Sequence, residues 1–182
     1  MARKFENVWE SMLVSALGPT LKRPLPKGRY GPLVHPGSGH DNGTASRPPE
    51  GALLLTDLVL DDRQELFVLD AKDYAPGHYP ETESITKQIL YRLMHSALFD
   101  PKSPYPLDKT CNAFLFPGCI PTPDGVFRLR RHQFEHDATG WGDIAGLAVD
   151  FDRVSRAFLN GRADASLREA VIESVRASRQ DP

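Results

Sequence analysis

The chain has 182 residues, of which 40% are hydrophobic and 25% are charged, and it carries a formal net charge of −2. These values suit one soluble globular domain spanning 1–182, and the net charge excludes a strongly basic nucleic-acid-binding module. Two cysteines are too few for a disulfide scaffold, and no apolar run is long enough to suggest a membrane span. We therefore expect a cytoplasmic protein with no membrane contact, in which Cys111 and Cys119 are reduced thiols.

The first segment has the pattern of an amphipathic helix that ends at Gly18-Pro19. Its apolar stripe comprises Phe5, Val8, Trp9, Met12, Leu13 and Ala16. Residues 18–52 are then rich in Pro and Gly and show neither a helix nor a strand pattern. We expect a long loop there within the domain, and loops of this length are commonly functional.

Two strands are predicted next, over 52–60 and 65–71, joined by a polar turn at 61–64. The simplest arrangement of two such neighbours is a hairpin. The second strand is continuously apolar over 66–69, which is typical of a central strand buried on both faces.

A helix is predicted over 84–99, with apolar residues such as Ile85, Ile89 and Leu93 on one side. The opposite side is polar and comprises Ser84, Gln88, Tyr91, Arg92 and His95. Two interpretations of Arg92 and His95 stay open, a solvated face and a face turned toward DNA.

The remaining elements alternate strands and helices. Strands are predicted over 112–116, 126–130 and 146–149, a short helical turn over 157–159, and a last helix over 166–177. Ser166 and Glu169 have the spacing of a capping box at the start of that helix. The order of elements predicts an α/β fold with a central mixed β-sheet flanked by helices.

Three residues in the predicted hairpin suggest chemistry. Asp57 lies in the first strand, and Asp70 and Lys72 lie two apart at the end of the second, on one side of it. Two carboxylates brought together by strand pairing suit Mg²⁺, and a nearby lysine suits the negative charge that develops when a phosphodiester is hydrolysed. The plainer interpretation is an ordinary polar strand end, because an Asp-X-Lys triplet is common by chance.

These residues carry a resemblance to a known family. Asp57, Asp70-Ala71-Lys72 and then Gln88 with Tyr91 resemble the pattern of the PD-(D/E)XK nuclease superfamily. The longer run to Asn112-Ala113-Phe114-Leu115-Phe116-Pro117 is similar to LlaJI-type restriction endonucleases, and the McrC nuclease subunit shares its Asp-Ala-Lys part. The resemblance covers roughly residues 5–120 and implies a restriction-endonuclease-like core.

The resemblance implies a role for each matching residue. Asp57 and Asp70 resemble the metal-binding acids, Lys72 the catalytic lysine, and Gln88 the helix glutamine that supports the site. Glu10 matches an acid on the first helix that adds a metal contact, although a solvated position fits it equally well. The implied cofactor is Mg²⁺, for which Mn²⁺ substitutes. Thr56 departs from the family, which usually has Pro before the first acid.

The implied function is a metal-dependent endonuclease that hydrolyses DNA phosphodiester bonds in restriction or phage defence. Its expected partners are DNA and either a second copy of the chain or a specificity subunit, because little beyond a nuclease core is present. Two alternatives stay open. One is a non-catalytic nucleic-acid-binding or assembly subunit that retains the nuclease fold, and the other is a hydrolase of a different substrate.

Overall fold

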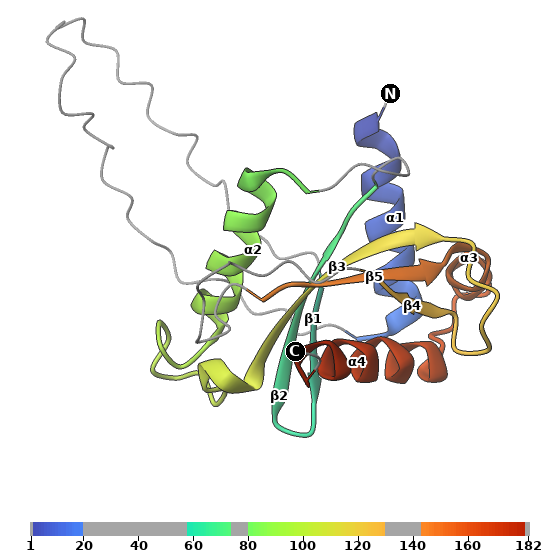
Figure 1. Cartoon of the computed structure of the whole chain (residues 1–182). Coiled ribbons are helices and arrows are strands. Elements are labelled where there is room, and N and C mark those ends of the chain that lie inside the picture. Colours follow the sequence, from blue (N-terminus) through green and yellow to red (C-terminus); the bar gives the residue numbers. More distant parts are fainter. Residues whose placement is uncertain (1, 20–57, 74–79, 130–142, 181–182) are drawn as a thin grey trace, which may run out of the picture.

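The computed structural model describes residues 2–19, 58–73, 80–129 and 143–180 (Figure 1). The greater part of the predicted loop over 18–52, the first part of the strand predicted over 52–60, and Asp57 lie outside the described residues. The expectations for these segments therefore stay predictions.

The described strands form one five-stranded sheet in the order β1-β2-β3-β5-β4. Their bounds are β1 Leu58–Asp62, β2 Glu65–Ala71, β3 Thr110–Gly118, β4 Val126–Arg128 and β5 Ala145–Asp150. The three inner strands, β2, β3 and β5, run parallel, while β1 and β4 are antiparallel edge strands. The sheet is mixed, as predicted, and the carboxyl ends of the three inner strands share one edge.

The predicted hairpin of β1 and β2 is confirmed, with Leu58 paired to Leu69 and Asp62 paired to Glu65. The turn is shorter than predicted, because Asp61 and Asp62 still belong to β1. Only Arg63 and Gln64 form it, with φ angles of 50° and 70°. Two consecutive positive φ angles are the geometry of a two-residue turn whose twist matches that of the strands it joins.

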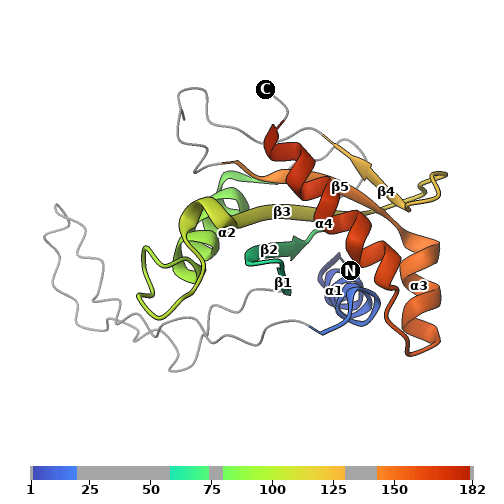
Figure 2. The same ribbon diagram turned by 90° about the horizontal axis from the view of Figure 1, so that it is seen from below.

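Helices lie on both faces of the sheet (Figure 2). Their bounds are α1 Ala2–Leu17, α2 Thr82–His95, α3 Phe151–Leu159 and α4 Ala165–Gln180, with a 3-10 turn η1 at Leu107–Lys109. The helices α1, α3 and α4 pack on one face, and α2 covers the β1–β3 part of the other. The coarse fold class is thus α/β, as predicted.

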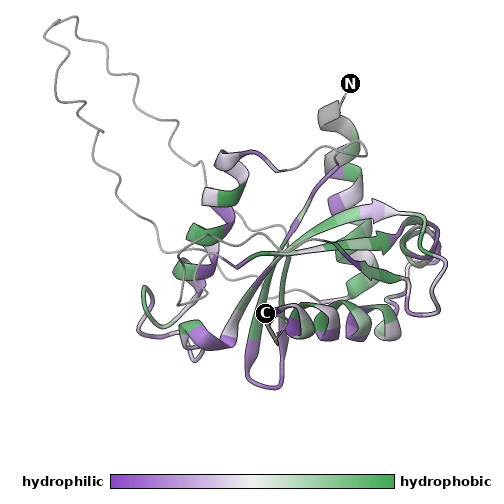
Figure 3. Cartoon of the chain, in the orientation of Figure 1, coloured by the Kyte–Doolittle hydropathy of each residue, from purple (hydrophilic) through white to green (hydrophobic). Residues whose placement is uncertain are grey.

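The larger core lies between the sheet and α1, α3 and α4. In Figure 3 the middle of the inner strands is mostly hydrophobic, whereas the turn between β1 and β2 is hydrophilic. On α1 the buried residues are Trp9, Met12, Leu13, Ala16 and Leu17. The predicted stripe was too wide, since Phe5 and Val8 are 38% and 47% exposed. The ring of Phe5 nevertheless stacks against Phe151, with the ring centroids 6.2 Å apart.

The sequence predicted only a short helical turn over 157–159, whereas α3 starts six residues earlier, at Phe151. The helix begins at Phe151, where the carboxylate of Asp150 accepts a hydrogen bond of 2.7 Å from the backbone N–H of Arg153. This is N-capping by a residue that also ends β5, so strand and helix follow each other without a connecting loop.

The predicted capping box of Ser166 and Glu169 is also wrong. Asp164 caps α4, because its carboxylate accepts a hydrogen bond of 3.0 Å from the backbone N–H of Leu167. The hydroxyl of Ser166 donates to the same carboxylate at 2.8 Å. Its own hydrogen bond is therefore directed at the cap rather than at the helix backbone.

Other boundaries differ by a few residues. The helix α2 begins two residues earlier and ends four residues earlier than predicted, because Ser96 already has extended backbone angles. The strand β3 extends beyond the predicted 112–116 at both ends. At the end of α1, Gly18 has a φ of +80°, a left-handed conformation that closes the helix where Gly18-Pro19 predicted.

Candidate active site at the carboxyl end of β2

Asp70 and Lys72 lie at the carboxyl end of β2, on the face covered by α2. Their positions alternate with Leu69 and Ala71, which belong to the core on the opposite face. Asp70 is 2% exposed and Lys72 is 6% exposed, and the lysine Nζ forms an ion pair with Oδ2 of Asp70. The sequence prediction that both side chains point the same way is confirmed.

A second lysine lies near this pair. The Nζ of Lys87, on α2, is 3.9 Å from Oδ1 of Asp70, and its side chain is 41% exposed. The Nζ of Lys72 lies 5.8 Å from the ring centroid of Phe114, which neighbours Asp70 on β3. One buried carboxylate thus faces two cations, one of them enclosed and one open to solvent.

Gln88 connects α2 to the strands just before this pair. Its Nε2 donates hydrogen bonds to the carbonyl oxygens of Val68, at 2.7 Å, and Ala113, at 3.4 Å. These carbonyls belong to the neighbouring strands β2 and β3, and Val68 precedes Asp70 by two residues. The Oε1 atom of Gln88 is buried without a hydrogen-bond partner among the described residues. Gln88 therefore fixes α2 on the sheet beside Asp70.

The polar side of α2 is buried, so the expectation of a solvated or DNA-facing side is wrong. Arg92 is 4% exposed, and its Nε donates to the carbonyl of Thr110 at 2.7 Å, while Nη2 donates to that of Leu107 at 3.2 Å. His95 is buried as well. The loop before β3 and the first residue of β3 supply carbonyl acceptors, which allow a guanidinium to be buried at low cost.

The helix α1 reaches the same strand ends from the other face. The indole Nε1 of Trp9 donates to the carbonyl of Leu115 at 3.1 Å, and the backbone N–H of Lys72 donates to the same oxygen at 2.9 Å. Glu10, next to Trp9, is half-buried and has polar partners, so it is not a freely solvated residue. The sequence predicted Trp9 only as a core residue, and its contact with Leu115 joins residues 106 apart.

The Mg²⁺ ion expected at this site stays a prediction. Among the described residues, no group of three or more His, Cys, Asp or Glu side chains could hold an ion. The oxygen atoms of Asp70 fit Mg²⁺ in their chemistry. A complete set needs further oxygens, for which Glu10 and the undescribed Asp57 are the candidates. Asp57 directly precedes Leu58, which pairs with Leu69 next to Asp70.

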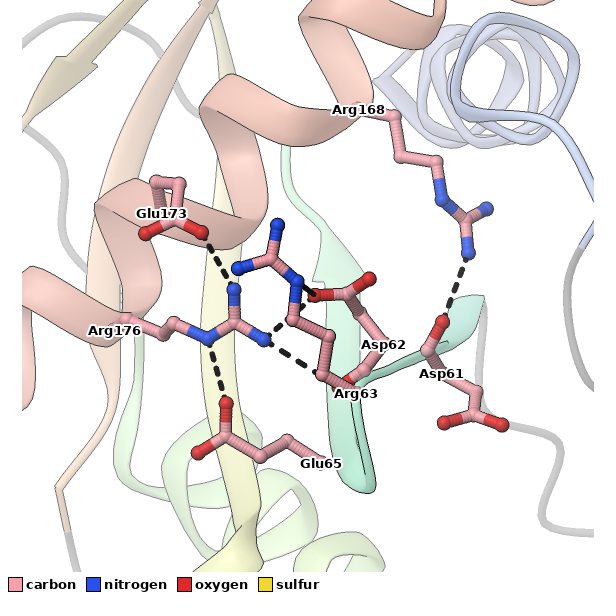
Figure 4. Close-up of polar contacts among 7 residues, drawn as sticks. All are labelled: Asp61, Asp62, Arg63, Glu65, Arg168, Glu173 and Arg176. Atoms are coloured by element: carbon pink, nitrogen blue, oxygen red, sulfur yellow. Dashed lines mark hydrogen bonds and ion pairs between the residues drawn. The ribbon is translucent and has the colours of Figure 1, made fainter.

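A second charged cluster lies at the opposite end of β2 (Figure 4). The guanidinium of Arg176, on α4, contacts the carboxylates of Glu65 and Glu173 at 2.6 Å each and that of Asp62 at 2.7 Å. Burial opposes its charge, but the hydrogen bonds to these three acids outweigh it and raise the pKa of Arg176. This cluster joins α4 to the hairpin and has a structural role.

No protein family, curated protein or solved structure matches the chain. None of the described helices is both long enough and apolar enough to cross a lipid bilayer.

Proposed function

We propose that the chain is a Mg²⁺-dependent endonuclease with a restriction-endonuclease-like core, which hydrolyses phosphodiester bonds in DNA in restriction or phage defence. The observation that carries the proposal is the buried pair of Asp70 and Lys72, held at the end of a parallel strand next to Gln88. The sequence resemblance assigns the same three residues to the metal-binding acid, the catalytic lysine and the supporting glutamine.

The burial of this pair favours a chemical role over a stabilising one. Removing two charges from water costs several kcal/mol per ion, and their attraction only partly offsets that cost. A pair of apolar side chains would fill the same space at least as favourably. A buried acid and base placed at a strand end are therefore better explained by reactivity than by stability.

In the proposed reaction, the oxygen of a water molecule bonds to phosphorus, one P–O ester bond breaks, and the leaving oxygen takes a proton. Mg²⁺, when bound, polarises the phosphate and lowers the pKa of a bound water. Asp70 supplies a ligand oxygen and orients the ammonium of Lys72. Lys72 either stabilises the negative charge on the phosphate or, when deprotonated, accepts the proton of the attacking water.

The second candidate function is a DNA-binding or assembly subunit that does not cut. The observation that favours it is that Asp70 belongs to no group of three or more candidate metal-ligand side chains among the described residues. This candidate predicts DNA binding that weakens with salt and no cleavage with any metal.

The deciding experiment is a plasmid cleavage assay in Mg²⁺, Mn²⁺ or EDTA. We compare the wild type with the double variant Asp70→Asn/Lys72→Met, which avoids leaving one buried charge without its partner. The matched control, Glu65→Gln/Arg176→Met, neutralises an ion pair at the other end of β2. We expect metal-dependent cleavage by the wild type and the control, and at least a hundredfold loss in the double variant while its circular dichroism is unchanged.

Retained metal-dependent cleavage in the Asp70→Asn/Lys72→Met variant would refute the proposal. Salt-sensitive DNA binding by the wild type without cleavage in any metal would support the second candidate instead. The roles of Asp57 and Glu10 are tested by Asp57→Asn and Glu10→Gln. If the carboxylates of Asp57 and Glu10 are metal ligands, each substitution raises the Mg²⁺ concentration needed for half-maximal cleavage. Substitution of a solvated carboxylate leaves that concentration unchanged.

A further inference from the structure

A large cavity lies beyond the ends of β3 and β5, away from the Asp70 site. Its volume is about 900 Å³, which is within the range of cavities that hold small ligands or parts of large ones. Three segments surround it, namely the turn after β3, the helix α3 and the connection from α3 to α4. It therefore adjoins the same edge of the sheet at which β2 ends.

Two arginines of this cavity have no polar partner among the described residues. Arg156, on α3, and Arg162, just after it, both line the cavity, together with the amide side chain of Asn160. Within the described part of the chain, neither guanidinium has a hydrogen bond or an ion pair, and both residues are exposed. Together they present up to ten N–H donors in a fixed fork geometry that matches phosphate oxygens.

The third arginine of the cavity, Arg153, is fully occupied. Its Nε and Nη2 donate to the carboxylate of Asp164 at 2.6 and 2.9 Å, and its Nη1 donates to the carbonyls of Pro123 and Asp124. Arg153 thus joins three chain segments and forms one wall of the cavity. It is not available to a ligand.

The two acids that line the cavity are occupied as well. Asp164 is paired with Arg153, whose hydrogen bond lowers the pKa of that carboxyl. The carboxylate of Asp150 accepts from the backbone N–H groups of Arg153, at 2.7 Å, and Ile120, at 3.2 Å. Neither acid forms a described hydrogen bond or ion pair with Arg156 or Arg162, and the three arginines outnumber the two acids among the lining residues, so the charge that the cavity offers to a ligand is positive.

The position of the cavity suggests which anion it binds. The strands β2, β3 and β5 are parallel neighbours, so Lys72 and the cavity lie at the same end of the sheet, with Lys72 on the α2 face and the α3 wall of the cavity on the opposite face. Two strand spacings separate β2 from β5, so the two sites are more than about 10 Å apart. A nucleic acid placed with one phosphodiester at Lys72 extends readily beyond that distance, and it carries a phosphate at every nucleotide.

We propose that Arg156 and Arg162 form a phosphate-binding site for the backbone of a bound DNA. The choice of DNA rests on the proposed function, whereas the preference for phosphate rests on two exposed guanidiniums that no described residue pairs with. Because these contacts involve no bases, they contribute affinity and not sequence recognition.

The test measures DNA binding without cleavage. Fluorescence anisotropy with a labelled duplex of about 20 base pairs is recorded in EDTA, between about 50 and 200 mM salt. The variant is Arg156→Gln/Arg162→Gln. The matched control is Arg63→Gln/Lys109→Gln, which removes the same charge from two exposed positions at the amino ends of β2 and β3.

We expect the arginine variant to bind about tenfold more weakly than the control, and its salt slope to fall by roughly 1.8, which corresponds to two lost phosphate contacts. Equal affinities and slopes for variant and control would overturn the proposal. Loss of inorganic phosphate binding, measured by calorimetry, together with unchanged DNA binding would overturn the assignment to DNA.

The outcome is independent of the proposed nuclease activity. If DNA binding depends on the two arginines but the protein cleaves DNA with none of the metals tested, the result would support this site and refute the nuclease activity. Cleavage that depends on Asp70 and Lys72, with no effect of the arginines on binding, would support the nuclease and refute this site.

Discussion

The two faces of the sheet bury different kinds of side chain. Toward α1 and α4, the inner strands present apolar residues such as Phe67, Leu69, Leu115 and Leu147. Toward α2, a smaller apolar cluster adjoins a row of buried polar residues. These polar residues are Asp70, Lys72, Gln88, Arg92, His95 and Asn112.

The difference indicates a division of roles. Burial of apolar area stabilises the fold by roughly 25 cal/mol per Å², whereas buried polar groups at best recover the cost of leaving water. The α1 and α4 face therefore carries most of the stability. The α2 face carries the groups of the proposed site, Asp70 and Lys72, together with Gln88 and Arg92, which bond α2 to backbone carbonyls.

Breaking the buried ion pair on the α2 face is expected to have the largest effect on stability. The substitution Lys72→Met leaves the carboxylate of Asp70 buried without its close partner, at a cost of about 3–5 kcal/mol. Asp70→Asn/Lys72→Met is expected to recover most of that loss. Urea denaturation of both variants measures the difference, and a single variant as stable as the wild type would contradict the account of the pair.

Leu69, next to Asp70 in the chain but on the face toward α1 and α4, allows the two faces to be compared. Leu69→Ala removes a fully buried side chain from the larger core and is expected to cost about 2–5 kcal/mol. Because its side chain points away from Asp70 and Lys72, cleavage per folded molecule is expected to stay unchanged. A specific loss of activity at temperatures where the variant is folded would show that the two faces are not independent.

The connection from α2 to the sheet is expected to have an intermediate effect. Gln88→Met keeps the size of the side chain but removes the hydrogen bonds to the carbonyls of Val68 and Ala113, with a loss of about 1–3 kcal/mol. Ile89→Met, on the half-buried side of the same helix, is the control and is expected to lose less. Thermal unfolding compares the stability of the two variants. Equal losses of stability would contradict the role of Gln88 in holding α2 on the sheet.

The smallest effect on stability is expected at Asp164, which caps α4 on the apolar face of the sheet. The hydrogen bond from Arg153 lowers the pKa of Asp164, so its stabilisation is complete above the unfolded value, near 3.9, and is lost as the pH falls below that value. Asp164→Asn keeps a good capping residue but loses the charge and one of the two oxygens that accept from Arg153, at about 1 kcal/mol near neutral pH. Stability curves of variant and wild type should converge in acid, and a constant difference would contradict this.

The sequence predicted best what depends on neighbouring residues. The hairpin followed from two apolar runs separated by a polar segment, and the shared orientation of Asp70 and Lys72 followed from strand alternation. The start of α3 was missed because Asp150 both ends a strand and caps a helix, and its sequence alone does not reveal the second role.

The contacts that build the site were less predictable. The burial of Gln88 and Arg92 depends on carbonyl acceptors that lie 15 to 25 residues away along the chain. Periodicity distinguished the two sides of α2 correctly but could not tell which side faces the sheet. The hydrogen bonds of the Arg153 guanidinium likewise depend on acceptors that lie 29 to 30 residues before it and 11 residues after it.

The shared carbonyl of Leu115 gives the protein an optical reporter of its own. The indole of Trp9 and the backbone of Lys72 bond to this one oxygen, so any shift of the strand end at Lys72 changes the surroundings of the indole. The chain has two tryptophans, and Trp141 lies outside the described residues. In a Trp141→Phe background, the emission of Trp9 alone follows what happens at Lys72, without any attached dye.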